Sequence, residues 1–356
     1  MKSRIPSHAS RVKRAVWHAL IGCLVALGPP TSGSAAEATQ EDARFARPGR
    51  LLPSTDGAVL NFQCSGQGSP TVVFDSGWED WAPAWSVVQP KVALWTRACA
   101  YDRAGVGFSS PGTQPRTSVR IAEELHSALK AGGIPGPYIL VGHAFGSDNV
   151  RTFAELHMAD VAAIVLVDGD VMDLESKESR DKDHLSHPRA IADLHQCRDL
   201  LASGKPLPRR ASEGEPPRTC AQQFFRGIPE VSWSPELNAS VLKVAETKPV
   251  LYEAFMSEMQ FMPADEDYLE EHQSSYGSRP LRAITTGKHG VHVNDATLSV
   301  EQRRYALDAQ SAQARWLSRS SRGKEVAAKD SSEYVQFDRP EIVVDTLREV
   351  YELVRR

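Results

Sequence analysis

The segment YILVGHAFG, residues 138–146, decides how the rest of the chain is interpreted. Its first four residues form a continuous apolar run, which is typical of a strand buried on both faces of a parallel sheet. Gly142 and Gly146 then enclose a short turn before a helical pattern. Glycines at these two positions let the strand and the helix approach closely while Ala144 between them takes a strained backbone conformation. The segment therefore predicts a tight strand-turn-helix junction.

The same alternation of strand and helix patterns continues on both sides of this junction. Apolar runs at residues 71–74, 163–167 and 281–285 predict further buried strands, and residues 325–328 predict a last one. Helical spacing separates these runs: one helix stops at Gly132, a long helix covers residues 298–317, and a final helix follows Pro340. This order predicts a doubly wound, mostly parallel α/β sheet.

One long stretch interrupts the alternation. Residues 171–279 are charged and contain prolines, with helical spacing and no clear strand, so we expect an inserted helical cap rather than a structureless loop. The expected organisation is a signal peptide over residues 1–36, a flexible linker over 37–47, the first part of the α/β core over 48–170, the cap over 171–279, and the second part of the core over 280–356.

Composition and charge exclude several classes of protein. The 356 residues are 41% apolar and 24% charged with a net charge of −4, which argues against disorder and against a multi-span membrane protein. Five basic residues and no acid lie in the first 36 positions, leaving an acidic body that is a poor match for nucleic acid. No later run is long enough to cross a bilayer.

The first 36 residues resemble a secretory leader, with a basic start, an apolar run over 15–28 and small residues up to Ala36. We expect an exported protein, either periplasmic or secreted. The alternative is a lipid anchor on Cys23, which lies in a lipoprotein-like Leu-Ile-Gly-Cys box. Export leaves four cysteines in an oxidising compartment, and two disulfides among them allow three pairings that spacing alone does not separate.

Several motifs outside the junction resemble the core of bacterial exported esterases and lipase-like proteins of the α/β-hydrolase fold. The residues that carry the resemblance are 70–85 with Ser76-Gly77-Trp78, 99–109 (CAYDRAGVGFS), 136–143, 165–168 and 334–340. In this family the junction is the nucleophile elbow Gly-x-Ser-x-Gly, and relatives carry Gly-His just before the last aromatic motif.

The resemblance implies a triad of serine, acid and histidine, and the chain departs from it at two positions. Ala144 stands at the nucleophile position, and Glu333 stands at the histidine position. Alanine has no oxygen to attack an acyl carbon, and a carboxylate does not replace the imidazole that relays the proton. We therefore expect a pseudoenzyme. The alternative is an active carboxylic-ester hydrolase in which Ala144 is engineered or the base is relocated to His289 or His292.

Other site residues also follow from the resemblance. The acid is Asp168 or Asp295, and a carboxyl lying beside Glu333 would have a raised pKa. The backbone N–H groups of Phe145 and of Gly77 or Trp78 would form an oxyanion hole, with His143 beside it.

This pocket would bind an acyl or carboxylate small molecule, and the sequence indicates no metal site and no cofactor. No protein partner is identified. In the sheet order of the fold, Cys64 and Cys99 lie on neighbouring strands, which favours Cys64–Cys99 and Cys197–Cys220.

Overall fold

The computed structural model describes residues 42–169, 171–204, 219–221, 233–286 and 296–356. Within these ranges eight strands form one sheet in the order β1-β2-β4-β3-β5-β6-β7-β8. The strands are β1 (Arg50–Pro53), β2 (Val59–Ser65), β3 (Thr71–Asp75), β4 (Ala98–Asp102), β5 (Tyr138–His143), β6 (Val161–Val167), β7 (Leu281–Thr285) and β8 (Gly323–Ala327). β2 is antiparallel to β1 and β4, whereas β3 to β8 run parallel.

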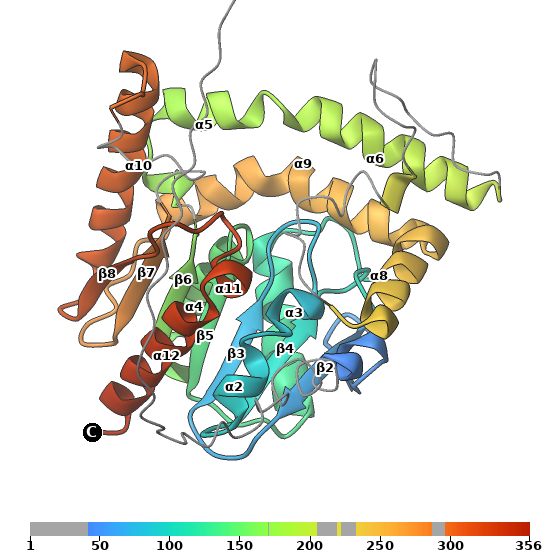
Figure 1. The fold of residues 1–356 in the computed structure, drawn as a ribbon, viewed down its shortest axis with the longest axis horizontal. Helices are drawn as coiled ribbons and strands as arrows, with labels where there is room; N and C mark the ends of the chain where they lie inside the picture. The colour runs from blue at the N-terminus through green and yellow to red at the C-terminus, as the bar shows by residue number, and fades with distance from the viewer. Residues whose placement is uncertain (1–41, 170, 205–218, 222–232, 287–295) are drawn as a thin grey trace, which may run out of the picture.

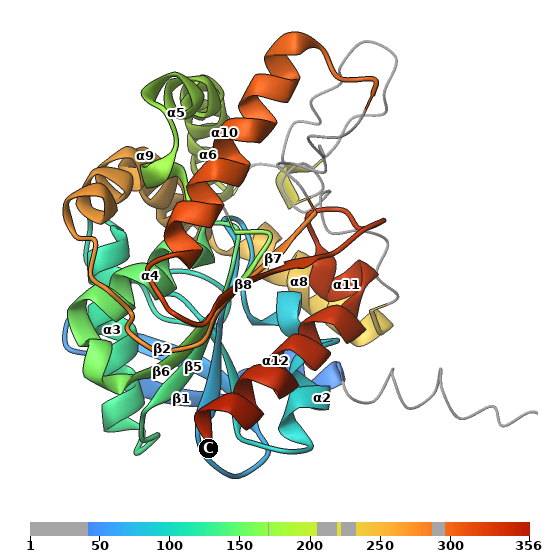
Figure 2. The ribbon, with the colours of Figure 1, turned by 90° about the vertical axis from the view of Figure 1, so that its left-hand side faces the viewer.

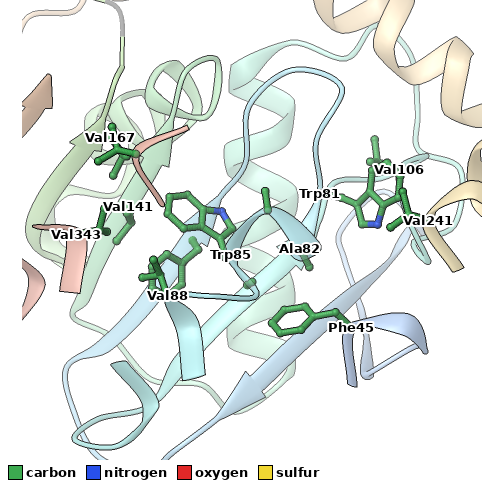
Figure 3. Packing of buried hydrophobic residues seen from close by; sticks show 14 of the residues in the cluster. Phe45, Trp81, Ala82, Trp85, Val88, Val106, Val141, Val167, Val241 and Val343 are labelled. Atoms are coloured by element: carbon green, nitrogen blue, oxygen red, sulfur yellow. The ribbon is translucent and has the colours of Figure 1, made fainter. Parts of the chain in front are cut away.

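Helices cover both faces of this sheet. α3 (Ser118–Ala131), α4 (Gly146–His157) and α10 (Val300–Leu317) lie on one face, and α2 (Gln89–Ala93) and α12 (Pro340–Val354) lie on the other (Figure 2). Successive strand residues alternate between two cores. Val72 and Phe74 pack into the core beneath α2 and α12, whereas Val73 packs into the core beneath α3 and α4. Figure 3 shows Trp85 and Val343 in the first of these cores.

The segment expected to be a cap contains helices throughout its described residues. After η4 (Met172–Leu174) come α5 (Lys177–His184), α6 (His187–Ala202), α8 (Pro235–Thr247) and α9 (Pro249–Glu271). α5, α6 and α9 extend over the end of the sheet at which the parallel strands finish (Figure 1). α9 is 23 residues long and continues through Pro263. This arrangement places α9 next to the loops that follow β3, β4 and β5.

The strands predicted from the apolar runs are confirmed, with small shifts at their ends. The largest shift among the helices is at α10, which begins at Val300 rather than at residue 298. Ser299 caps it: its hydroxyl accepts a bond from Gln302 N, and the Gln302 side chain accepts one from Ser299 N. This reciprocal capping stops the helix from extending further toward its N-terminus.

The start of the described chain differs from the expected flexible linker. A short 3₁₀ helix, η1 (Ala43–Ala46), packs against α8, and Phe45 within it is 1% exposed. Asp42 accepts a hydrogen bond from Ser234 N. Burying one aromatic ring and pairing one carboxylate is enough to order this polar segment, and neither effect is visible in its composition.

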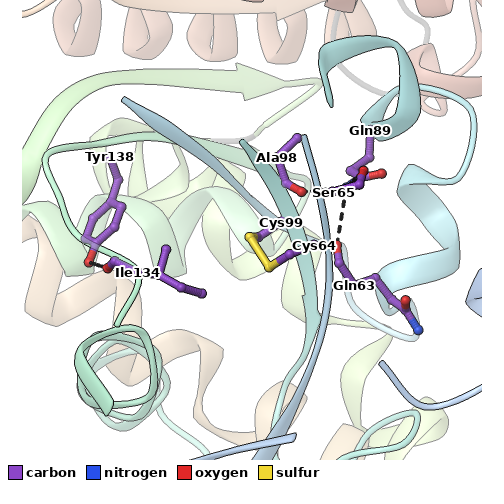
Figure 4. Close-up of a disulfide and its surroundings, with 8 residues drawn as sticks. All are labelled: Gln63, Cys64, Ser65, Gln89, Ala98, Cys99, Ile134 and Tyr138. Atoms are coloured by element: carbon purple, nitrogen blue, oxygen red, sulfur yellow. Dashed lines mark hydrogen bonds between the residues drawn. A yellow bond between two sulfur atoms is a disulfide. The ribbon is translucent and has the colours of Figure 1, made fainter. Parts of the chain in front are cut away.

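Two disulfides are present, with the pairing that the resemblance favours. Cys64 on β2 is directly opposite Cys99 on β4, and their Cα atoms are 4.1 Å apart (Figure 4). Cys197 on α6 is bonded to Cys220. Both bonds are compatible with an oxidising compartment. Among the described residues, no helix is both long and apolar enough to cross a bilayer.

Candidate functional site

The junction between β5 and α4 has the tight geometry that its glycines predict. Ala144 has a φ of +45°, a left-handed conformation that is unfavourable for a residue with a Cβ. A Cβ added at Gly142 would lie 2.4 Å from Gly146 O, and one at Gly146 would lie 2.6 Å from Asp75 O. Only glycine fits at these two positions. The turn therefore holds the Ala144 methyl group, which is half-buried, at the position where the fold carries its nucleophile.

The loop after β3 lies directly against this methyl group. A Cβ added at Gly77 would be 3.4 Å from Ala144 Cβ and 3.0 Å from His143 Nδ1. Phe145 is the first residue after Ala144 and is 6% exposed. The two segments expected to supply oxyanion-hole N–H groups are thus adjacent to the nucleophile position.

A buried arginine holds that loop in place. Arg103, just after β4, donates to the carbonyl oxygens of Ser76 (2.7 Å) and Gly77 (3.0 Å). It also pairs with Asp75 (3.0 Å) and, through Nε, with Glu258 on α9 (2.7 Å). The guanidinium carbon lies 5.4 Å from the ring centroid of Phe145. We call the loop after β3, residues 76–81, the oxyanion loop. The Arg103 side chain therefore links the oxyanion loop, the elbow and the cap.

Glu333 is placed beside the elbow by its backbone rather than by its carboxylate. Its carbonyl oxygen is 3.1 Å from His143 Nε2, and its side chain is exposed. Tyr334 follows, and its ring centroid is 5.2 Å from that of His143. A carbonyl oxygen only accepts, so His143 Nε2 carries a proton and donates it. The described geometry thus brings the 333–334 segment to the elbow.

The carboxyl group that interacts with Glu333 is Asp80, a residue that sequence reasoning missed. Burial, opposed by Arg103 and reinforced by the charge of Glu333, raises the pKa of Asp80 to about 7. Tyr334 forms a side-chain hydrogen bond with Asp80. Burial and the neighbouring Asp80 charge also raise the pKa of Glu79, which has a φ of +67°. The loop after β3 therefore brings two carboxyl groups to the site, with Glu333 as a third nearby.

Asp168 is engaged in a local structural contact. It follows β6, and its Oδ1 accepts hydrogen bonds from the backbone N (3.0 Å) and hydroxyl (2.7 Å) of Thr286, just after β7. These bonds join the ends of two neighbouring strands. The alternative acid Asp295 and the alternative bases His289 and His292 lie outside the described residues.

Comparisons with known proteins agree with this geometry. A family model described as the alpha/beta hydrolase fold matches residues 70–190. Solved structures similar to the chain include a thermophilic esterase from Thermogutta terrifontis (17% identity, 86% of this chain and 99% of that one, TM-score 0.57). A putative α/β hydrolase from Nostoc is also similar (15% identity, 86% and 99%, TM-score 0.64). The chain has the α/β-hydrolase fold.

Curated relatives match at higher sequence identity, but some of them match only in part. This α/β-hydrolase-fold chain is 32% identical to a probable transporter of Hormonema carpetanum and 31% identical to the uncharacterised Bacillus subtilis protein YqjL. Those matches span 28% and 38% of the chain and only 15% and 54% of the two relatives. An AB hydrolase superfamily protein of Gibberella zeae is 23% identical over 80% of the chain and 87% of its own length.

Three tryptophans near the α/β-hydrolase elbow have different environments. Trp85 is fully buried, and its ring centroid lies 4.8 Å from that of Phe74, so it is a core residue. Trp81 is also buried, at 4% exposed. Trp78 is half-buried, and its Nε1 donates to Phe255 O on α9. Among these three, Trp78 joins the oxyanion loop to the cap.

The sequence contained only weak signals for the residues that were missed. Asp80 and Glu79 sit in a Trp-Glu-Asp-Trp run whose charge in a predicted loop is unremarkable. Glu258 lies 155 residues from Arg103, in the cap. No local spacing connects these residues with their partners. Glu258 reaches Arg103 through the packing of α9 over the strand ends, whereas Asp80 meets Tyr334 where the segments after β3 and β8 come together.

Proposed function

We propose that this α/β-hydrolase-fold protein is exported, has lost ester hydrolysis, and binds an ester-like small molecule at the elbow. The observation that carries the proposal is the Ala144 methyl group at φ +45°, packed against Gly77. A methyl group has no electron pair for attack on an acyl carbon, and the turn that presents it is otherwise complete. Losing the nucleophile typically costs about 10⁴ to 10⁶ in turnover.

The oxyanion loop supports retained binding. Arg103 is 2% exposed and keeps the Ser76–Gly77 carbonyls in place, so the N–H groups of this loop stay ordered without substrate. Ordered donors of this kind bind a carbonyl oxygen as well as a developing oxyanion. Binding of an acyl group therefore does not require the missing triad.

The charge around the site distinguishes between the expected ligands. Burial raises the pKa of both acids, that of Asp80 to about 7, so Asp80 becomes negative as the pH rises through neutrality. Glu333 adds a further negative charge to the pocket edge. A carboxylate ligand would be repelled by these groups, whereas a neutral ester would not. A neutral acyl compound is the better match.

The leader supports export. A basic start, an apolar run and small residues precede residue 37, and the two disulfides require an oxidant to form.

An ester-hydrolysis series tests the catalytic part. The full chain, Ala144→Ser, Glu333→His and the double variant are assayed on p-nitrophenyl butyrate. We expect ester hydrolysis by the unmodified chain and by both single variants to be no faster than in buffer alone. Only the double variant should hydrolyse the ester at a measurable rate. Hydrolysis by the unmodified chain would refute the loss of activity. Hydrolysis by Ala144→Ser alone would show that a base other than residue 333 is in place, favouring the active-hydrolase alternative.

A thermal-shift comparison tests the binding part. Ethyl butyrate, as a neutral ester, is expected to raise the unfolding midpoint of the unmodified chain in proportion to the logarithm of its concentration, and butyrate is not. The matched control is Gly77→Val, whose side chain would fill the space beside Ala144. Equal shifts for ester and carboxylate, or an ester shift that survives in Gly77→Val, would contradict binding at this site.

A further inference from the structure

Two helices on the face of the sheet opposite α12 bring two histidines and a glutamate together. Glu123 and His126 lie three residues apart on α3, and His157 is the last residue of α4. One ligand atom from each of these side chains lies within 4.8 Å of the other two, and this is the group with metal-ligand chemistry among the described residues. None of these residues takes part in the elbow site.

One distance between two of the ligand atoms already matches that of a filled site. His157 Nε2 is 3.4 Å from Glu123 Oε2. Two ligand atoms about 2.1 Å from a tetrahedral zinc ion are about 3.4 Å apart, so this pair already has the required separation. His157 Nε2 is buried, and its 3.4 Å contact with Glu123 Oε2 is too long for a well-formed hydrogen bond. A metal ion would satisfy this nitrogen.

The two imidazole rings are held in position by their neighbours. They stack with their centroids 3.6 Å apart and their planes 16° from parallel. Phe153 on α4, fully buried, contacts both rings edge-on, at 5.5 Å from His126 and 5.2 Å from His157. Because a bound ion lies in the plane of each imidazole that holds it, one of these stacked rings must rotate before both can bind the same ion.

A fourth residue provides the outer contact typical of metal-bound histidine. Asp160 Oδ2 lies 2.8 Å from His126 Nε2 and also 3.1 Å from Lys130 Nζ. A carboxylate that accepts from one ring nitrogen orients the imidazole and increases the basicity of the other.

We infer that Glu123, His126 and His157 form a binding site for a borderline divalent cation, with zinc as the expected ion and Asp160 as the orienting outer residue. Two imidazoles and one carboxylate favour Zn²⁺, Cu²⁺ or Ni²⁺ over Mg²⁺ and Ca²⁺, which prefer oxygen ligands. The sequence had indicated no metal site, because the three ligands are divided between two helices and only the packing of α3 on α4 brings them together.

The site joins α3 to the far end of α4. α4 has 12 residues and starts two positions after Ala144, so about 17 Å separates its ends. The ion would thus stabilise the helix pair and would not touch a ligand at the elbow. Three protein ligands leave one coordination position for water.

Titration of the chelator-treated full chain with ZnCl₂ tests the inference by calorimetry and thermal shift. We expect the unmodified chain to bind one equivalent of zinc and to unfold at a higher temperature when zinc is present. The His126→Gln/His157→Gln double variant should lose both effects. MgCl₂ should produce neither. The matched control is His195→Gln, which removes an exposed histidine on α6 and should leave the equivalent intact. Asp160→Asn should weaken zinc binding by about 10- to 100-fold.

Several results would overturn the site. The site is refuted if the unmodified chain binds no zinc, if the double variant binds as much zinc as the unmodified chain, or if His195→Gln loses the bound zinc. X-ray absorption spectroscopy of the unmodified zinc-loaded chain does not depend on the variants folding. It should show a nitrogen and oxygen shell with two imidazoles, and a sulfur shell or a shell without imidazole would contradict the assignment.

Discussion

The carbonyl oxygen of Glu333 lies 3.1 Å from Nε2 of His143, the residue that precedes the nucleophile position. This contact ties the segment after β8 to the elbow through a main-chain atom, which any residue at position 333 would supply. The geometry of the segment is therefore independent of the glutamate side chain, whose exposed carboxylate acts on the site through its charge on Asp80. Substitutions at residue 333 are expected to change electrostatics more than structure.

The strained elbow predicts that Ala144→Gly stabilises the fold. At φ +45° the Ala144 Cβ is unfavourable, and glycine removes that cost while losing some chain entropy. We expect a net gain of about 0.5 to 1 kcal/mol in the free energy of unfolding, measured by urea titration. Ala192→Gly, at an exposed position within α6, is the control and should lose about 1 kcal/mol. A loss in both variants would contradict the strained geometry.

Asp80 predicts a pH dependence of stability below neutrality. Its pKa in the folded chain is about 7, above the usual value of 3.8. At a pH between these two values, Asp80 is protonated in the folded state and ionised in the unfolded state. Stability therefore falls as pH rises from about 4 to 7, by about 1 kcal/mol per pH unit from this group. Asp80→Asn should remove this contribution, which urea titrations at pH 4.5, 5.5, 6.5 and 7.5 would measure. An unchanged slope would count against a buried, protonated Asp80.

Arg103 predicts a large loss of stability on truncation. Arg103→Met would leave Asp75 and Glu258 buried without their cation, which costs about 3 to 5 kcal/mol in the free energy of unfolding. The control is Arg47→Met, which breaks the exposed pair with Glu236 and should cost less than about 1 kcal/mol. Similar losses from the two variants would show that Arg103 does not link the sheet to the cap.

The disulfides predict a specific peptide map and a loss of stability when the bond between Cys64 and Cys99 is removed. Digestion without reductant should recover Cys64 linked to Cys99 and Cys197 linked to Cys220. Removing the first bond, with Cys64→Ser and Cys99→Ala, frees a loop of 35 residues and should cost about 4 kcal/mol in the chain-entropy model. A peptide joining a sheet cysteine to a cap cysteine would refute this pairing.

Much of the fold could be predicted from local patterns. The apolar runs that became β3, β5, β6 and β7 are buried on both faces, and this environment selects continuous apolar sequence. The glycines at 142 and 146 indicated the elbow because no larger residue fits against the neighbouring carbonyls. By contrast, the packing of residues 42–46 on α8 depends on one ring and a few hydrogen bonds to distant residues, which no periodicity reveals.

The sequence by itself determined the order of strands and helices, the tight junction at Ala144 and the chemistry that a methyl group excludes there, because each depends on residues close together in the chain. Only the tertiary structure decided which charges meet. Asp80 reaches Tyr334 because the segments after β3 and β8 meet at one end of the sheet. Arg103 reaches Glu258 because α9 crosses the strand ends, and His126 stacks on His157 because α3 packs on α4. Electrostatic effects act through space, so the pKa of Asp80 and the proposed zinc site follow from the packing of loops and helices rather than from spacing along the chain.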